Sequence, residues 1–159
     1  MPILILHNIR SVHNVGSIFR TADAAGVAKI YLTGYTPTPL DRFNRERKDF
    51  IKVSLGAESS VPWEAAMQLS PVLKKLKKDG YEIIAIEQSK TSTPLFDYKP
   101  TGKKIAVVMG NEVLGISTQS LKYADHVLEI PMRGKKESLN VSVAAGSALF
   151  EITRFHTDA

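Results

Sequence analysis

The sequence predicts an α/β domain with a mostly parallel sheet flanked by helices. Short apolar segments alternate along the chain with segments that have the period of an amphipathic helix, as in proteins built from βαβ units. Several apolar segments are hydrophobic throughout rather than at every second residue, which is expected of strands covered on both faces. Five segments are predicted to be strands: residues 3–7, 29–33, 82–86, 105–109 and 127–130.

Four helices are predicted around these strands, at residues 15–25, 71–79, 118–123 and 141–154. Gly26 and Gly80 follow the first two, where glycine commonly ends a helix. Residues 33–50 and 88–104 are rich in turn-forming residues and are predicted to be long loops, which in compact domains are often functional. Ligands of parallel sheets bind at the carboxyl ends of the strands, so segments that follow strands are the first candidates for a site.

Composition excludes several classes of protein. The 159 residues are 43% hydrophobic and 23% charged, as expected of one globular domain. No apolar run approaches the roughly 20 residues that span a bilayer, and residues 1–6 are predicted to be a buried strand rather than a signal peptide. Cysteine is absent, which excludes disulfide and thiolate chemistry and favours a cytoplasmic location.

The formal net charge is +5, and the basic residues occur in three clusters. The lysines of residues 74–78 lie on a predicted helix and are interpreted as a solvated surface. The other two clusters lie in predicted loops, and we expect them to bind a phosphate backbone. They consist of Arg42, Arg45, Arg47, Lys48 and Lys52, and of Arg133, Lys135 and Lys136.

A first polar motif occupies residues 14–20. Asn14 is predicted to be the N-cap of a helix, because its side chain accepts hydrogen bonds from free backbone N–H groups. Arg20 follows Gly16 by one turn, which predicts that a phosphate or ribose can approach the backbone beside the guanidinium. A capped surface helix with a solvated arginine explains this segment equally well when it is taken alone.

A second motif, residues 110–115, follows the apolar segment 105–109. Its two glycines are spaced as in a P-loop, but Ile116 stands where the lysine is required, so a nucleoside triphosphatase is excluded. The dinucleotide fingerprint is absent as well. The motif can present backbone N–H groups and the Glu112 carboxylate to a small ligand, although a plain strand-to-helix turn would also explain it.

A third motif has two parts, residues 130–132 at the end of a strand and residues 138–140 before a helix. Asn140 is a candidate N-cap and Ser138 a candidate turn residue. The helix 141–154 is apolar on more than one face, which predicts burial, partly in an interface with a second copy of the chain.

The three motifs, in this order, resemble those of the SpoU/TrmH family of RNA ribose methyltransferases, within the SPOUT superfamily, and the resemblance extends over residues 3–154. It implies a SPOUT-type fold with a C-terminal trefoil knot and an obligate homodimer. It also implies transfer of a methyl group from S-adenosylmethionine to a ribose 2′-hydroxyl of tRNA or rRNA. Residues 1–159 are expected to be a single methyltransferase domain without the accessory RNA-binding domain of many members.

The resemblance assigns roles to individual residues. Catalytic roles fall on Asn14, Arg20, Glu112, Ser138 and Asn140. The methyl donor pocket is expected to use Ile86, Gly110, Gly115, Ile130, Met132 and Leu139. RNA contacts are expected from Arg20, Arg42, Arg45, Arg47, Lys48, Arg133 and Lys135. No metal is expected, because a sulfonium methyl group is already activated.

Positioning is expected to dominate the chemistry. Alignment of the hydroxyl with the methyl group supplies about 7–11 kcal/mol, whereas a general base typically adds about 10²–10⁴-fold. A guanidinium stays protonated at neutral pH, so Arg20 is expected to bind the adjacent phosphate and polarise the hydroxyl. Two alternatives stay open: a noncatalytic RNA-binding module with the same fold, and a methyltransferase that acts on an RNA base.

Overall fold

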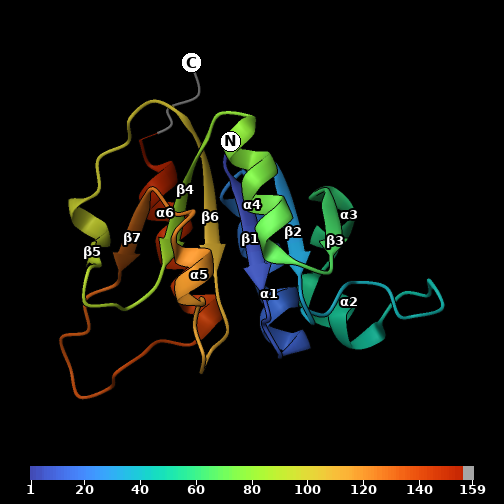
Figure 1. The fold of residues 1–159 in the computed structure, drawn as a ribbon. Helices are drawn as coiled ribbons and strands as arrows, with labels where there is room; N and C mark the ends of the chain where they lie inside the picture. The colour runs from blue at the N-terminus through green and yellow to red at the C-terminus, as the bar shows by residue number, and fades with distance from the viewer. Residues whose placement is uncertain (156–159) are drawn as a thin grey trace.

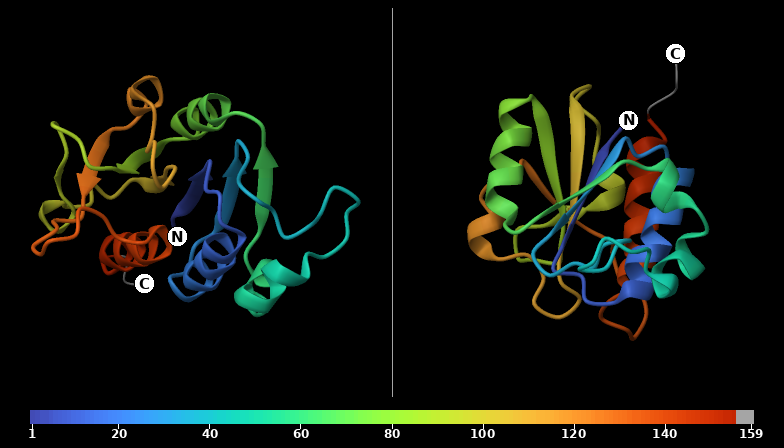
Figure 2. Two further views of the ribbon diagram at one scale, coloured as in Figure 1. Left: turned by 90° about the horizontal axis from the view of Figure 1, so that it is seen from below. Right: turned by 90° about the vertical axis from the view of Figure 1, so that its right-hand side faces the viewer.

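The computed structural model describes residues 1–155 and shows a seven-stranded parallel sheet between two layers of helices (Figures 1 and 2). The strand order is β3-β2-β1-β6-β4-β7-β5. The strands are β1 (Ile3–His7), β2 (Lys29–Thr33), β3 (Trp63–Ala66), β4 (Tyr81–Ile86), β5 (Thr93–Pro94), β6 (Lys104–Met109) and β7 (His126–Glu129). The helices are α1 (Val12–Ala24), α2 (Lys48–Ser54), α3 (Ala57–Ser60), α4 (Leu69–Lys78), the 3₁₀ helix η1 (Leu95–Asp97), α5 (Thr118–Leu121) and α6 (Val141–Thr153).

Each face of the sheet has its own hydrophobic core. Helices α1, α2, α3 and α6 cover one face, and α4 and α5 cover the other, as the right-hand view of Figure 2 shows. Successive residues of β1 point to opposite faces, so Leu4 and Leu6 enter the first core while Ile3 and Ile5 enter the second. Burial on both faces explains why the central strands are apolar at every position.

The predicted fold class is confirmed, and all five predicted strands and all four predicted helices are present with ends shifted by at most three residues. Gly26 and Gly80 follow helix ends with φ angles of +71° and +85°, as predicted. The two predicted loops are partly wrong. Helix α2 begins inside the first at Lys48, and the second contains the short β5 and η1.

The prediction that Asn14 caps the first helix is wrong. Helix α1 begins three residues earlier, and its N-cap is Ser11, whose Oγ accepts a hydrogen bond from the Asn14 backbone N–H at 3.2 Å. Serine is as good an N-cap as asparagine, so the sequence offered two candidate starts. The Asn14 side chain is therefore left available for a partner outside its own helix.

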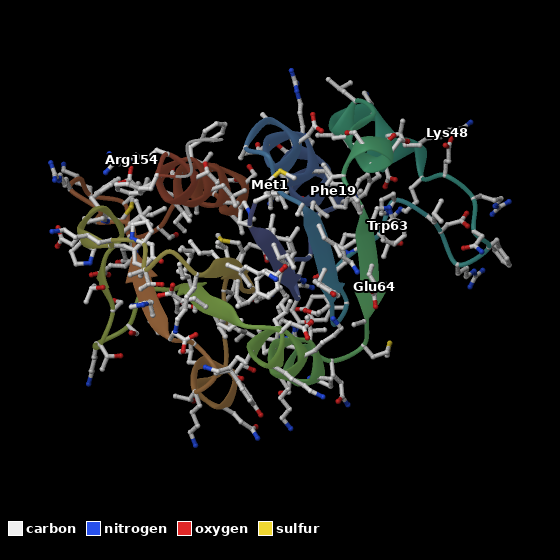
Figure 3. All side chains as sticks on the ribbon, turned by 90° about the horizontal axis from the view of Figure 1, so that it is seen from above. Met1, Phe19, Lys48, Trp63, Glu64 and Arg154 are labelled. Carbon is white, nitrogen blue, oxygen red and sulfur yellow. The ribbon has the colours of Figure 1, made fainter. Side chains whose placement is uncertain are left out.

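The interpretation of Gly16 as an opening for phosphate or ribose is also wrong. Gly16 is buried, and a Cβ atom there would lie 3.1 Å from the Phe50 carbonyl oxygen and 3.2 Å from the Val53 Cβ, both on α2. Beside it, Phe19 of α1 packs edge-on against Phe50, with ring centroids 5.2 Å apart (Figure 3 labels Phe19). Glycine at this position thus lets α1 and α2 approach each other closely.

Candidate functional site

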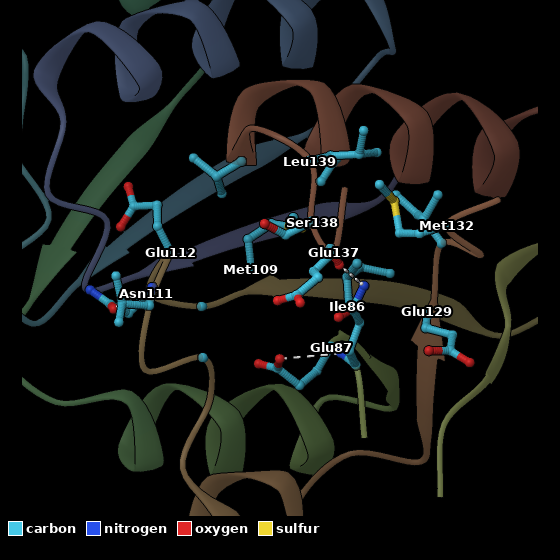
Figure 4. Close-up of a pocket in the computed structure, with 17 residues that line it drawn as sticks. Ile86, Glu87, Met109, Asn111, Glu112, Glu129, Met132, Glu137, Ser138 and Leu139 are labelled. Atoms are coloured by element: carbon cyan, nitrogen blue, oxygen red, sulfur yellow. Dashed lines mark hydrogen bonds between the residues drawn. The ribbon is translucent and has the colours of Figure 1, made fainter. Parts of the chain in front are cut away.

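A cavity of about 360 Å³ opens at the carboxyl ends of β4, β6 and β7 (Figure 4). Its volume falls in the range of roughly 300–1,000 Å³ typical of small-molecule sites. We call it the strand-end cavity. Its lining residues come from three loops and from the start of α6: Ile86, Glu87, Gln88, Met109, Gly110, Asn111, Glu112, Val113, Gly115, Glu129, Ile130, Met132, Glu137, Ser138, Leu139, Val141 and Ala144.

The second motif forms one wall of this cavity as a tight loop organised by Asn111. The Asn111 Oδ1 accepts hydrogen bonds from the N–H groups of Val113 at 2.9 Å and Leu114 at 2.7 Å. Its Nδ2 donates to the Asn8 carbonyl at 2.9 Å and to the Tyr35 hydroxyl at 2.8 Å. Sequence reasoning missed Asn111, although an asparagine directly after a strand is a typical turn-forming signal.

Both glycines of this motif are required by close packing. A Cβ on Gly110 would lie 2.5 Å from the Ile116 side chain and 2.9 Å from its backbone nitrogen. Gly115 has a φ of +65°, and a Cβ there would collide with the Glu87 carboxylate. That carboxylate accepts a hydrogen bond from the Ile116 N–H at 2.8 Å. The loop is therefore tied to the end of β4 by contacts that leave no room for side chains.

The third motif forms the opposite wall. The Asn140 Oδ1 caps α6, as predicted, and accepts a hydrogen bond from the Ser142 N–H at 2.9 Å. Its Nδ2 donates to the Asn14 Oδ1 at 3.2 Å, which joins the first motif to the third. The Gln88 Nε2 donates to the Glu137 carbonyl at 2.9 Å, so the segment before α6 is also tied to the end of β4 (Figure 4).

The cavity combines an apolar lining with carboxylates. Met109 is buried in the floor, and Figure 4 shows the side chains of Met132 and Leu139 on one side of the opening. Glu112 and Glu129 also line the cavity. The arrangement suits a ligand with a flat apolar part, hydroxyl groups that donate to carboxylates, and a positive charge.

All six residues predicted to hold the methyl donor line this one cavity: Ile86, Gly110, Gly115, Ile130, Met132 and Leu139. Two of the predicted catalytic residues, Glu112 and Ser138, line it as well. Asn14 and Asn140 meet beside it through their side-chain hydrogen bond. The structure therefore gathers parts of the chain that lie up to 126 residues apart in the sequence.

Arg20 lies outside the strand-end cavity. It is exposed on α1 and lines a second cavity between α1 and α2, together with His13, Asp49 and Lys52. Arg47 binds Asp49 through two hydrogen bonds, of 3.2 Å from Nε and 3.0 Å from Nη2, and this guanidinium holds the pKa of the Asp49 carboxyl below its usual range. Val12, Val53 and Leu55 line this second cavity as well, so Arg20 has polar and apolar neighbours and does not lie in the strand-end cavity.

The residues predicted to bind RNA lie in two separate segments. Arg42, Arg45, Arg47 and Lys48 lie in or directly after residues 34–47, which connect β2 to α2 and which we call the basic loop. Arg133 and Lys135 are exposed in the connection between β7 and α6. In Figures 1 and 2 the two segments lie at opposite ends of the sheet.

A polar network that sequence reasoning missed links the ends of β1 and β2. The His7 Nδ1 lies 2.9 Å from the Thr33 Oγ1, and the Asn8 Nδ2 lies 3.2 Å from the His7 Nε2. The Asn8 Oδ1 accepts a hydrogen bond from the Tyr35 N–H at 3.1 Å, so the Asn8 amide group faces the His7 ring as a donor. His7 must then be neutral with its proton on Nδ1, and burial lowers its pKa accordingly.

Residues 1–155 contain neither a membrane-spanning helix nor a cluster of metal ligands. None of their helices has the length and hydropathy needed to cross a lipid bilayer. In the same part of the chain, no three histidine or carboxylate side chains are placed to hold a metal ion together.

The sequence and the fold both match those of known proteins. The sequence matches the family described as SpoU rRNA Methylase over residues 1–150. It is 36% identical over 152 residues to the 23S rRNA (guanosine-2′-O-)-methyltransferase RlmB of Escherichia coli K12, which covers 96% of this chain. It is 35% identical over 156 residues to the RlmB of Xylella fastidiosa. The chain spans 59% of the length of each of these two relatives.

Two solved structures show how far the fold is shared. The A. aeolicus TrmH/SpoU tRNA modifying enzyme is 32% identical, with a TM-score of 0.82 over 96% of this chain and 73% of its own. The AdoMet-bound rRNA methyltransferase from Sinorhizobium meliloti is 27% identical, with a TM-score of 0.86 over 99% of this chain and 57% of its own. With its parallel sheet, its three motifs and these matches, the chain belongs to the SpoU rRNA methylase family.

Proposed function

We propose that the protein transfers a methyl group from S-adenosylmethionine to a ribose 2′-hydroxyl of tRNA or rRNA. The observation that carries this proposal is the strand-end cavity, where six predicted donor residues converge with Glu112 and Ser138. The relatives named above are ribose methyltransferases of rRNA, and a structural neighbour of the same family is a tRNA modifying enzyme.

The residues of the cavity fit this donor. Apolar side chains such as Met109, Ile130 and Leu139 suit an adenine ring, and the Glu129 carboxylate suits ribose hydroxyls or a cation. Gly110 and Gly115 of the second motif line the cavity with backbone atoms alone. When bound, S-adenosylmethionine supplies a methyl group on a positively charged sulfur, already activated for transfer.

The chain's own residues position the acceptor. We assign to Arg20 the phosphate next to the target ribose and the negative charge that develops on the 2′-oxygen. Because Arg20 lies outside the strand-end cavity of its own chain, this contact is assigned to Arg20 of the second copy in the homodimer proposed below. Ser138 and Glu112 lie in the cavity and hold the ribose, while the bond between Asn14 and Asn140 fixes α1 against the start of α6. A guanidinium donates hydrogen bonds but neither loses nor accepts a proton at neutral pH, so the contribution of Arg20 is charge and orientation. The 2′-oxygen gains the methyl group as the bond between sulfur and methyl breaks, and the hydroxyl proton passes to solvent.

A homodimer is part of the proposal. Helix α6 leaves large apolar side chains exposed, with Val143 and Phe150 each 52% exposed and seven residues apart on one face. Leu139, directly before the helix, is 39% exposed. A second copy of the chain packed on this face would bury these side chains, and it would bring a second set of motif residues near the strand-end cavity.

Three further expectations remain proposals. Residues 1–159 act as one methyltransferase domain, and the absence of cysteine favours the cytoplasm. The C-terminal trefoil knot is supported by one observation. The loop after β6 and the segment after β7 border the same cavity, as a threaded C-terminal segment requires.

The proposal is tested by methyl transfer from isotopically labelled S-adenosylmethionine to total small RNA and to ribosomal RNA, followed by digestion to nucleosides. We expect the label in 2′-O-methyl nucleosides. Label in a base would instead establish the base methyltransferase. Binding of RNA without any binding of S-adenosylmethionine would establish the noncatalytic RNA-binding module.

A further inference from the structure

The basic loop, residues 34–47, projects from the body of the molecule between β2 and α2, where it is the light-blue segment at the right of Figure 1. Its tip is a closed turn. Leu40 and Glu46 form an antiparallel bridge, and the Asp41 N–H donates to the Arg45 carbonyl at 2.8 Å. A long surface loop with an ordered tip differs from a flexible connection, and such loops are often functional.

The turn is organised by the Asp41 carboxylate. It accepts hydrogen bonds from the backbone N–H groups of Phe43 at 2.8 Å and Arg45 at 3.0 Å, and from the Arg45 Nε at 3.1 Å. Asn44 adopts a φ of +60°, a conformation that asparagine tolerates better than most residues. The position of Phe43 at the tip is therefore fixed by the backbone around it.

Phe43 is exposed to solvent, and two arginine side chains lie close to its ring. Its side chain is 62% exposed. The guanidinium carbons of Arg42 and Arg45 lie 4.8 Å and 4.9 Å from the centre of its ring. Arg45 is paired with Asp41, whereas Arg42 has no carboxylate partner within residues 1–155. The tip thus presents an aromatic ring and two guanidinium planes, and the guanidinium of Arg42 is available for a phosphate.

We propose that Phe43, Arg42 and Arg45 form a stacking platform for an unpaired base of the RNA substrate, at a nucleotide other than the one that is methylated. This inference rests on the proposed function, since it assumes an RNA substrate. Proteins that recognise single-stranded RNA stack exposed bases on aromatic rings and on arginine planes, next to cations that bind the backbone. The tip of the basic loop places all three of these features within one short turn.

Charge favours RNA over a protein partner. Arg47, Lys48 and Lys52 follow the tip directly, and the platform is thus the outermost part of a basic segment. An unpaired base is favoured over a duplex, because the face of a base inside a duplex is covered by its neighbours in the stack and cannot reach Phe43.

The platform and the strand-end cavity are separate but connected. The basic loop leaves the sheet at β2, whereas the cavity lies at β4, β6 and β7. At the base of the loop, the Tyr35 hydroxyl accepts a hydrogen bond from the Asn111 Nδ2 of the second motif at 2.8 Å. A base held at the tip therefore helps to set the position of the RNA relative to the cavity, and its loss should raise KM more than it lowers kcat.

The test compares the binding of two fluorescein-labelled RNAs, an unstructured single strand and a fully paired duplex of equal length. Phe43→Ala should weaken single-strand binding by about 5- to 150-fold, the range measured for loss of one stacked base, and should leave duplex binding within about twofold. Phe43→Trp should retain single-strand binding. Phe96→Ala is the matched control, because Phe96 is an exposed phenylalanine, 53% accessible, in η1.

Each result has one meaning. Unchanged single-strand binding in Phe43→Ala overturns the platform. Equal losses on both RNAs also overturn it, because they indicate a general effect on the loop. Altered self-association in Phe43→Ala, measured by sedimentation, with unchanged RNA binding assigns the tip to a contact between copies. If the wild-type protein binds neither RNA, both the RNA substrate of the proposed function and the stacking platform are overturned. Binding of S-adenosylmethionine is measured separately, because it depends neither on an RNA substrate nor on the stacking platform.

Discussion

The Asn140 Nδ2 donates a hydrogen bond to the Asn14 Oδ1 at 3.2 Å, across 126 residues of sequence. Asn140 also caps α6, so its side chain makes two different interactions. Its Oδ1 accepts a hydrogen bond from the first turn of α6, and its Nδ2 donates the hydrogen bond to Asn14 on α1. A substitution that keeps the Oδ1 acceptor and removes the Nδ2 donor can therefore separate the stability of α6 from the contact between α6 and α1.

Asn140→Asp should keep the cap and lose the amide donor that Asn140 directs at the Asn14 Oδ1, because a carboxylate accepts hydrogen bonds but cannot donate one. We expect stability to stay within about 0.5 kcal/mol of wild type and methyl transfer to fall at least tenfold. Asn140→Ala is the comparison, and it should cost about 1 kcal/mol of stability through the lost cap. Chemical denaturation and methyl transfer assays measure the two effects. Full activity in Asn140→Asp would leave Asn140 with a capping role alone.

Arg20→Ala should abolish methyl transfer while S-adenosylmethionine binding stays within about twofold of wild type. Donor binding should be unaffected because Arg20 lines the cavity between α1 and α2 and not the strand-end cavity. Arg20→Lys should recover little activity, because an ammonium group cannot make the paired hydrogen bonds of a guanidinium. Calorimetric titration with the donor provides the binding measurement. Loss of donor binding in Arg20→Ala would make Arg20 a structural residue.

Gly16→Ala should destabilise the protein by about 1 kcal/mol, which lowers Tm by roughly 2–4 °C for a chain of this size. The added methyl group meets the Phe50 carbonyl at 3.1 Å, and overpacking costs about 1–3 kcal/mol, which exceeds the helix propensity gained on replacing glycine. Gly146→Ala on α6 is the matched control. Its Cβ would meet the Thr21 Cγ2 at 3.4 Å, an ordinary contact, so Tm should not fall. Thermal unfolding of both variants shows whether overpacking against α2 or the gain in helix propensity dominates the effect of Gly16→Ala.

Stability should decrease with decreasing pH as His7 becomes charged in the unfolded chain. Burial lowers the pKa of His7 in the folded protein, so below the ordinary histidine pKa of about 6.5 the unfolded state binds a proton that the folded state excludes. The loss should begin near that pH and continue until the lowered pKa is passed. His7→Gln should give a flatter curve over this window. Urea unfolding across a pH series measures it, and identical curves would contradict the prediction.

RNA binding should depend strongly on salt if the basic loop contacts phosphates. Each phosphate contact on a single strand contributes about −0.7 to the slope of log K against log salt concentration. Arg42→Gln and Lys48→Gln should each reduce the slope by about that amount. Lys78→Gln serves as the control, because Lys78 lies on α4, on the opposite face of the sheet from α2. An unchanged slope in both loop variants would remove the basic loop from the RNA interface.

The central strands could be predicted because their signal is local. Segments such as β1 and β6 are apolar at every position, and this pattern follows from burial on both faces. Strand β3 escaped prediction because it lies at an edge, pairs with β2 alone and leaves Glu64 exposed. Strand β5 has two residues, too few to form any pattern. Helix α2 is short and basic, and it is stabilised by the packing of Phe50 on α1, which its own sequence does not reveal.

Only part of the candidate site could be predicted from the sequence. The glycines of the second motif and the cap at Asn140 follow from local chemistry, and the donor residues followed from the family resemblance. Asn111 could not be recognised in the same way. Its partners, Asn8 and Tyr35, lie 103 and 76 residues away, so its role exists only once β1, β2 and β6 are assembled side by side.

The projection of the basic loop away from the sheet bears on how relatives of this protein diverge. Doubling the length of a surface loop costs only about 0.6 kcal/mol of closure entropy, so insertions at residues 34–47 are cheap for the fold. Changes at Gly110 or Gly115 are not, because neighbouring atoms already occupy the space that a side chain would need. Under the proposed function, changes in the basic loop would alter RNA binding at one end of the molecule without altering the residues of the strand-end cavity.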